Sequence, residues 1–199
     1  DPCVGDKGDR RVVPLRGVIL DGPFELSVKP GEVGGDVSAS ILLSGSGRAA
    51  GAPLPAFIGL SGTIRMGGTV DWRLDGRIER RGDGKRWPAR IEVATDLRGL
   101  EIDAPRPFAK PPADPRPTRV VLDLPGTART EVRINSGAAR AALLFAQRDD
   151  RRWDLERGAA RFDGRPVAMP AQPGLHVAGD WPEFDLGEWL ALRTDGAGS

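Results

Sequence analysis

Hydrophobic and polar residues alternate with a period of two along much of this chain. The clearest run places Val70, Trp72, Leu74 and Ile78 on one side of an extended backbone and charged residues on the other. Shorter runs with the same alternation recur between clusters of glycine, proline and charged residues, which is typical of β-strands joined by turns. The pattern therefore predicts a mainly β fold.

Turn residues divide the first half of the chain into expected strands and connections. Residues 45–55 are mostly small or proline, which predicts a loop. Residues 80–86 form a charged turn, and the shift of the apolar phase at Gly99 predicts a β-bulge before Leu100. The expected strands span 24–28, 37–43, 57–60, 70–78 and 91–97, the first two as a hairpin.

A proline-rich segment separates these strands from a second group. Six prolines between 105 and 117 remove backbone donors and favour extended backbone, so we expect a crossover at 104–118 within a single β segment, 1–199. Asp185 and Glu188 form a capping box, which predicts a short C-terminal helix through Leu192. The expected strands span 120–124, 132–134, 143–145, 153–155 and 175–178, with Phe162 and Val167 continuing the pattern.

Composition narrows the functional classes. The chain has 29 Lys and Arg and 28 Asp and Glu, and the two signs alternate, so we expect no nucleic-acid partner. No run reaches the ~18 apolar residues that a membrane helix needs, so we expect no segment of this chain to span a bilayer. The chain begins at Asp1 without a signal peptide, and we interpret it as a piece of a longer protein.

Residues that could carry catalysis are few. His176 is the only histidine and lies in the expected strand 175–178, which predicts the polar face of that strand instead of a metal site. Cys3 is the only cysteine, so no internal disulfide forms. Residues 59–62 depart from a nucleophile elbow, and the glycines at 45–51 lack the lysine of a phosphate loop. Paired carboxylates leave a glycosidase open, but the sequence favours a protein that is not an enzyme and holds no cofactor or metal.

The predicted sheet has one apolar side and little helix to cover it. Such a sheet must close into a barrel or sandwich, pack on neighbouring segments, or bind an apolar ligand. The tryptophans could form a sugar-stacking surface, but a tryptophan in an alternating strand is more typical of a core or a groove lining. They are Trp72, Trp87, Trp153, Trp181 and Trp189.

Three stretches of the sequence resemble the YhdP type of AsmA-like proteins. Residues 173–189 read PGLHVAGDWPEFDLGEW and are similar to the signature P-G-L-x-V-x-G-x-x-P-x-x-D-L-x-x-W. Phe184 and Asp180 stand where leucine and arginine are common in the family. The other stretches are the L-S-G…W-R-L strand pair over 60–74 and the Pro/Lys passage over 97–112. Together they cover most of the chain in the family's order.

The resemblance implies a long periplasmic protein with an inner-membrane anchor upstream of this fragment. In such a protein an extended, twisted antiparallel sheet forms an apolar groove, here expected with a short C-terminal helix. The implied role is to move phospholipid between the inner and outer membranes and to maintain the outer-membrane barrier. No catalytic residues come with the family. The alternative is a structural or interaction module of the cell envelope whose sheet closes around a dry core.

The implied groove would cover the apolar side of the sheet with phospholipid acyl chains. Burial of apolar area at ~25 cal/mol per Å² would hold a lipid tail without fixed polar anchors. Each candidate lining residue fits an ordinary core as well as a groove. The candidates are Val70, Trp72, Leu74, Ile78, Ile91, Val93, Leu97, Val120, Leu122, Leu124, Val132, Ile134, Leu143, Phe145, Leu175 and Val177.

Overall fold

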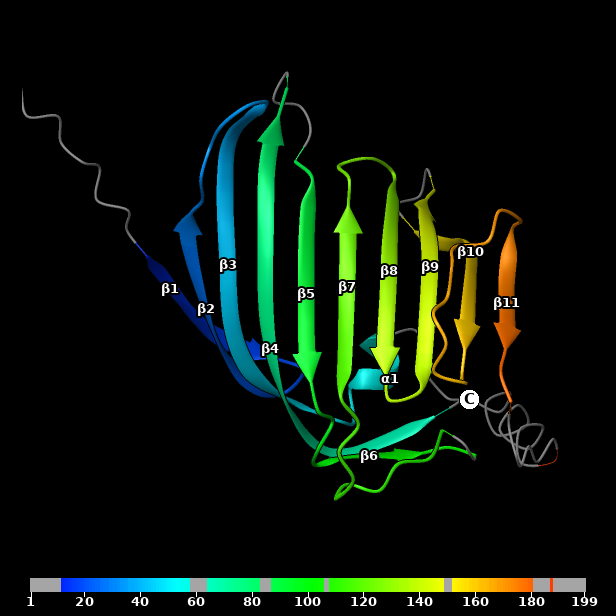
Figure 1. Ribbon diagram of the computed structural model, residues 1–199. Helices are drawn as coiled ribbons and strands as arrows, with labels where there is room; N and C mark the ends of the chain where they lie inside the picture. The colour runs from blue at the N-terminus through cyan, green and yellow to red at the C-terminus, as the bar shows by residue number, and fades with distance from the viewer. Residues whose placement is uncertain are drawn as a thin grey trace, which may run out of the picture.

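The computed structural model of the protein describes residues 12–57, 64–82, 87–105, 108–148 and 152–180, together with Gly187. The described residues form one open sheet of eleven strands and one short helix, so the mainly β prediction is confirmed. Figure 1 shows the strands side by side in an extended, twisted, groove-like sheet, as the resemblance implies. Strands β1 and β11 occupy its two edges.

The first four strands form an antiparallel meander. The expected hairpin over 24–43 is confirmed, because β2 pairs with β3 with Val28 opposite Leu43. Strand β1, which the alternation left unassigned, joins β2 through a turn in which Leu20 and Asp21 have φ angles of 50° and 57°. Turns of this kind match the twist of the strands that they connect. The four strands are β1 (Val13–Ile19), β2 (Gly22–Pro30), β3 (Val37–Ala50) and β4 (Arg65–Arg81).

The loop predicted at 45–55 is wrong for most of its length. Strand β3 continues through Ala50, and Phe57 ends the helix α1 (Leu54–Phe57) instead of beginning a strand. The rest of the strand expected over 57–60 lies outside the described residues. Glycine recurs in β3 because neighbouring side chains lie over it. A Cβ on Gly47 would come within 2.6 Å of Cζ2 of Trp72. Glycine in this strand makes room for neighbouring side chains. Because glycine is also common in turns, the composition of the segment predicted a loop.

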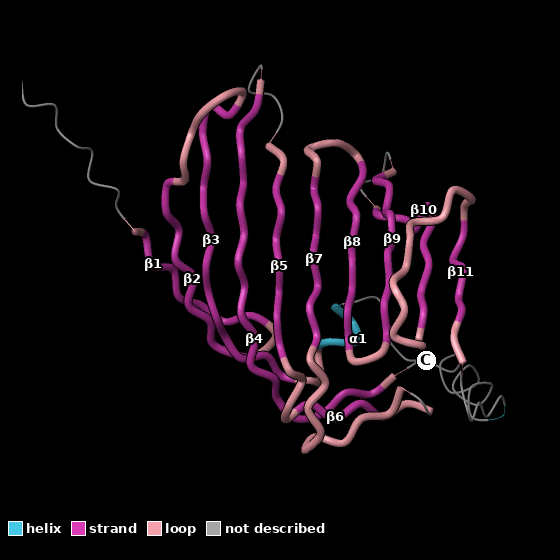
Figure 2. The backbone as a smooth tube through the Cα atoms, in the orientation of Figure 1, coloured by secondary structure: helices cyan, strands magenta, loops and turns pink. Residues whose placement is uncertain are grey.

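Strand β4 bends near its start and takes part in two separate ladders. Gly68 has a φ of 74°, and a Cβ there would lie 2.0 Å from the carbonyl oxygen of Gly99. Before the bend, β4 pairs with β6 (Leu100–Asp103), with Met66 opposite Ile102. Figure 2 shows this two-stranded ribbon at the foot of the main sheet.

The strand predicted over 91–97 is confirmed as far as Thr95, whereas its extension to Leu97 and the bulge predicted at Gly99 are wrong. Strand β5 (Ala89–Thr95) ends first, and Leu97 and Gly99 follow in a turn with φ angles of 53° and 88°. Leu100 then begins β6, which pairs with β4. The apolar phase shifts because the chain leaves one ladder and enters another.

Side chains at the foot of the sheet form the main buried core of the described residues. Ala49, Val70 and Leu100 are 2%, 5% and 2% exposed. In Figure 1, α1 lies behind the strands, and its Leu54 packs against this core. The end cluster consists of these three buried residues with Leu20, Leu54, Met66, Trp72, Leu97 and Ile102.

Residues 104–117 connect β6 back to the main sheet and are held by two cations. Lys110 is 2% exposed, and its Nζ donates to two backbone carbonyls at 2.8 and 3.0 Å. Burial, together with the charge of Arg116, lowers the pKa of Lys110. Arg116 donates to the carbonyls of Phe108 and Ala109. These side chains supply donors to a segment whose prolines cannot donate.

The meander expected in the second half is confirmed. Val120 lies opposite Val93 on one side and opposite Ile134 on the other. A β-bulge lies between Leu155 and Arg157. The strands are β7 (Thr118–Leu124), β8 (Arg129–Ser136), β9 (Ala139–Gln147) and β10 (Trp153–Arg161).

The last strand departs from the antiparallel pattern. β11 (Gly174–Ala178) pairs with β10 in parallel, so residues 162–173 must cross back along the sheet. The strand pattern expected to continue through Phe162 and Val167 is therefore wrong. The ring of Phe162 meets that of Phe108 edge to face, with centroids 5.0 Å apart. Apart from Gly187, which is helical, the predicted C-terminal helix lies outside the described residues.

Candidate functional site

The pairing register gathers apolar side chains from ten strands on one face of the sheet. Side chains opposite each other in a ladder share a face, so the register assigns each position. All the candidate lining residues except Leu97 fall on this face, and Leu97 packs in the end cluster. Their contact with lipid stays a prediction.

Three rows of residues define the apolar face. The middle row is Leu15, Leu26, Gly45, Leu74, Val93, Val120, Ile134, Ala141, Ala160 and Val177. The row above it is Val13, Val28, Leu43, Gly76, Ile91, Leu122, Val132, Leu143, Gly158 and Leu175. The top row is Pro30, Ile41, Ile78, Ala89, Leu124, Thr130, Phe145 and Leu155.

These rows run across the strands. Neighbouring strands lie ~4.8 Å apart, so ten strands carry each complete row over roughly 43 Å. The first three strands contribute Leu15, Leu26 and Leu43, which were not among the predicted lining residues. The alternation in 24–28 and 41–43 was the sequence signal for two of them. Glycine and alanine positions in the rows carry no such signal.

Large side chains lie sideways over glycines on the apolar face. A Cβ on Gly17 would meet the ring of Phe24 at 2.8 Å, and one on Gly158 would meet Leu143 at 2.6 Å. Trp72 covers Gly47 in the same way. Because rings and branches lie along the sheet, the face offers apolar surface with low relief.

The apolar face is covered at its foot and stays accessible elsewhere in the described residues. Only five hydrophobic residues of that part of the chain are buried, and three belong to the end cluster. Towards the edges, Leu15 is 46% exposed and Val177 is 54% exposed. The central positions, such as Leu74 and Val93, are partly buried by their neighbours in the sheet. This is a large apolar patch for a protein surface.

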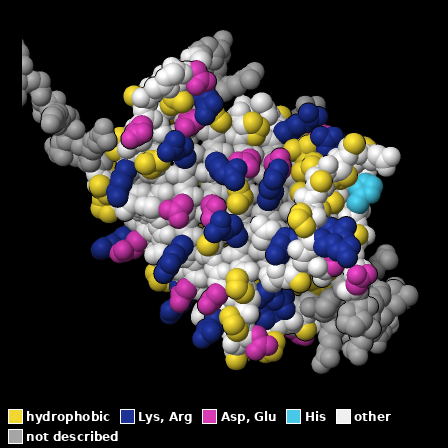
Figure 3. Space-filling view, in the orientation of Figure 1, with side chains coloured by type: hydrophobic (Ala, Val, Ile, Leu, Met, Phe, Trp, Pro, Cys, Tyr) yellow, Lys and Arg dark blue, Asp and Glu magenta, His cyan; other side chains and the backbone are white. Residues whose placement is uncertain are grey.

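The opposite face carries arginines and carboxylates that pair between strands. Figure 3 shows positive and negative side chains interspersed over this charged face. Arg48 Nε lies 2.8 Å from Asp71, and Arg90 Nη1 lies 2.6 Å from Asp123. The charged face is defined by Arg16, Glu25, Arg48, Asp71, Arg73, Asp75, Arg90, Glu92, Arg119, Asp123, Glu131 and Arg133.

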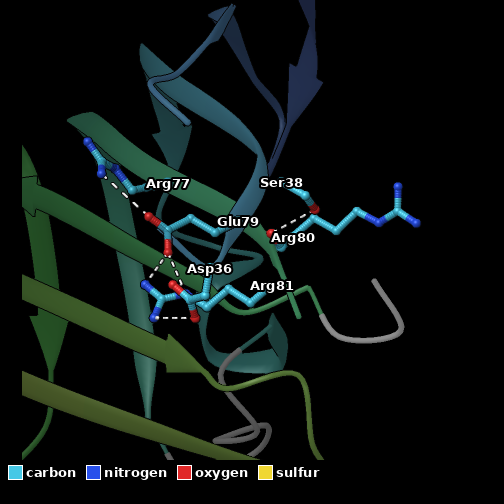
Figure 4. A network of polar contacts seen from close by, with 6 residues as sticks. All are labelled: Asp36, Ser38, Arg77, Glu79, Arg80 and Arg81. Atoms are coloured by element: carbon cyan, nitrogen blue, oxygen red, sulfur yellow. Dashed lines mark hydrogen bonds and ion pairs between the residues drawn. The ribbon is translucent and has the colours of Figure 1, made fainter. Parts of the chain in front are cut away.

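Because side chains alternate along β4, its neighbouring arginines lie on opposite faces of the sheet. Figure 4 shows Arg77 and Arg81 meeting Glu79 on the charged face, with Asp36 beside Arg81. Hydrogen bonding from Arg81 lowers the pKa of Glu79. The side chain of Arg80 extends away from this network, and its backbone carbonyl accepts a hydrogen bond from Ser38.

The charged face also contains two shallow hollows. One is lined by Arg77, Arg90 and Glu131 among others, and the second by Arg48 and Asp71. Both signs of charge line each hollow, and many of the groups already pair with one another. Neither hollow therefore offers a surface of a single sign.

Groups suited to metal or acid–base chemistry are sparse. His176 lies opposite Ala159, on the face away from Leu175 and Val177, as its place in the strand predicts. No group of three or more His, Cys, Asp or Glu side chains that could hold a metal occurs among the described residues. The apolar face is thus the main candidate for function.

Comparisons with known proteins place the chain in a family. A family model described as YhdP protein matches residues 11–199, which is most of the chain. The comparison with curated proteins found no match, and neither did the comparison with solved structures. Within the described residues, no helix has the length and apolar character to span a membrane. The match over 11–199 confirms the resemblance seen in the sequence, and the chain belongs to the YhdP family.

Proposed function

We propose that this chain is a segment of a bridge-like periplasmic protein that moves phospholipid between the inner and outer membranes. The observation that carries the proposal is the apolar face, which extends across ten strands and is covered, among the described residues, mainly at the end cluster. Membership of the YhdP family supports a place in the cell envelope. The membrane anchor is proposed to lie outside this chain.

The energetics of the apolar face suit a sliding ligand. Burying ~200 Å² of acyl chain would contribute about 5 kcal/mol at ~25 cal/mol per Å². This attraction has no direction, and successive strands offer similar Val, Leu and Ile side chains. A tail can therefore move from strand to strand without breaking specific polar contacts.

The alternative of a scaffold with a closed, dry core has less support. Edge strands β1 and β11 do not pair with each other, so the sheet of the described residues is open. We also propose that the chain is not an enzyme, a prediction that an assay of the purified protein can test.

The test uses Leu74→Asp, with a photoreactive residue at Trp72 in the full-length protein. On an open face the carboxylate stays hydrated when lipid is absent, so the melting temperature should change little while lipid crosslinks fall at least tenfold. Arg73→Asp, on the charged face of the same strand, is the matched control and should keep the crosslinks. Collapse of the melting temperature in Leu74→Asp, with no crosslink in the parent, would favour the scaffold.

A further inference from the structure

The upper edge of the apolar face combines tryptophan with arginine. The β4–β5 ladder continues past its last strand pair, because Glu79 N–H donates to the Pro88 carbonyl at 2.9 Å. This places Arg80 opposite Trp87, and the Arg80 guanidinium carbon lies 5.8 Å from the centroid of the Trp87 ring. Both residues lie in the next row above Ile78 and Ala89.

A second tryptophan occupies the same edge further across the sheet. Trp153 lies opposite Gln147, two residues before Leu155 of the top row, and so on the same face. Trp87 and Trp153 are 44% and 45% exposed, which leaves each indole partly in water. The upper border consists of Arg80, Trp87, Gln147 and Trp153.

The lower edge of the face over β5, β7 and β8 has a different chemistry. The lower border consists of Thr95, Thr118 and Ser136, which lie opposite one another in the ladders. Their hydroxyls are already bonded: Thr118 Oγ1 lies 2.7 Å from Ser136 Oγ, and Thr95 Oγ1 accepts from the Leu97 N–H. The lower border thus consists of uncharged hydroxyls, whereas the upper border carries the charge of Arg80.

We propose that the upper border binds the phosphate of a lipid headgroup while the tail extends down the strands. Indole rings favour boundaries where one side is apolar and the other is wet. A guanidinium donates paired hydrogen bonds that match the geometry of phosphate, and Arg80 brings positive charge to this border. The inference rests on the proposed function and adds the orientation of the lipid and the side chains that bind its headgroup.

The dimensions of the face agree with this orientation. From Trp87 through β5 to Thr95 the extended chain rises roughly 27 Å at about 3.4 Å per residue. One leaflet contributes about 15 Å of the ~30 Å hydrocarbon core of a bilayer. A tail that starts at the upper border therefore ends among the apolar rows before it reaches the hydroxyls.

The experiment uses full-length protein and two phosphatidylglycerol probes. One carries a diazirine beside the glycerol and the other carries it at the tail end. Mass spectrometry of crosslinked peptides should find the first probe near Trp87 and Trp153, and the second near Ile91 and Val93, short of the lower border. The reverse distribution would overturn the orientation while leaving the proposed function intact.

Charge recognition is tested with Arg80→Gln and a lipid that lacks phosphate. The substitution should lower labelling by phosphatidylglycerol about tenfold and leave labelling by the matching diacylglycerol probe unchanged. Arg77→Gln, on the charged face of the same strand, is the control, and melting temperatures verify folding. Equal labelling of Arg80→Gln and parent would overturn the phosphate site alone. If the parent is labelled nowhere on the apolar face, the proposed function fails as well.

Discussion

The two faces of the sheet differ in how far their apolar side chains are exposed. On the charged face, Val121 and Ala142 are 6% and 3% exposed, and Arg133 lies between them in the ladders. The long aliphatic stem of an arginine can cover such neighbours while its charge stays in water. On the apolar face, Leu175 and Val177 are 53% and 54% exposed.

This difference shows which face needs a second molecule. Long charged side chains can cover the small residues between them, and their ion pairs keep the charged face soluble. Valine, leucine and glycine have no such reach, so a face made of them is covered only by another element or by a ligand. In the described residues that element is the end cluster, which covers the foot of the apolar face.

The largest loss of stability is expected at the covered foot of the sheet. Lys110→Met removes the buried ammonium that donates to the Leu100 and Pro111 carbonyls, and should lower the free energy of unfolding by ~2–3 kcal/mol. Urea denaturation measures the loss. Lys29→Met, at an exposed position on β2, is the matched control and should change it by less than ~0.5 kcal/mol. Equal effects would show that the foot of the sheet is not a buried core.

A smaller loss of stability is expected from crowding the apolar face beside the end cluster. Gly47→Ala would place a Cβ 2.6 Å from Trp72 and 2.8 Å from the Pro23 carbonyl oxygen, so unfolding free energy should fall by about 1–3 kcal/mol. Gly76→Ala is the control on the same face, because its Cβ would approach Leu43 no closer than 3.4 Å. That variant should be neutral or slightly stabilising in thermal melts. Similar losses in both would contradict the close packing over Gly47.

The charged face should tolerate loss of an ion pair. Arg90 and Asp123 have side chains that are 62% and 35% exposed, so Arg90→Gln should cost less than ~1 kcal/mol. The difference in unfolding free energy from the parent should shrink further in 1 M salt, where the Debye length is only about 3 Å. A loss above ~2 kcal/mol, measured by the same urea denaturation, would mean that this face contributes to stability as well as solubility.

Acid should weaken the contact between Arg161 and Asp163 at the end of β10. Hydrogen bonding from Arg161 holds the pKa of Asp163 at about 2, helped by the Arg165 backbone N–H. Because the folded-state pKa lies below the ordinary value of about 3.9, the stabilisation is fully present above pH ~4 and is lost as the pH falls toward 2. Carbon-detected NMR titration of the Asp163 carboxyl should give this pKa, and Arg161→Gln should return it toward 3.9. An unchanged pKa in that variant would assign the shift to another group.

Prediction from sequence succeeded where alternation was strict. Val70 to Ile78 form a strand as expected, because period two over charged neighbours leaves one arrangement of faces. It failed at 45–50, where glycine and serine look like a loop but form part of β3. It also failed at Gly99, where a phase shift of one residue describes a bulge and a change of partner strand equally well.

The sequence by itself determined the mainly β class, the separation of charged from apolar side chains, and most of the apolar face. These follow from alternation, which is local in the chain. Only the tertiary structure decided that the sheet is open, that β11 runs parallel to β10, and that Leu97 belongs to the end cluster. It also decided that Arg80 and Trp87 meet at the upper border. Such features depend on which strands pair and in which register, and pairing partners are set by contacts between residues far apart in the chain.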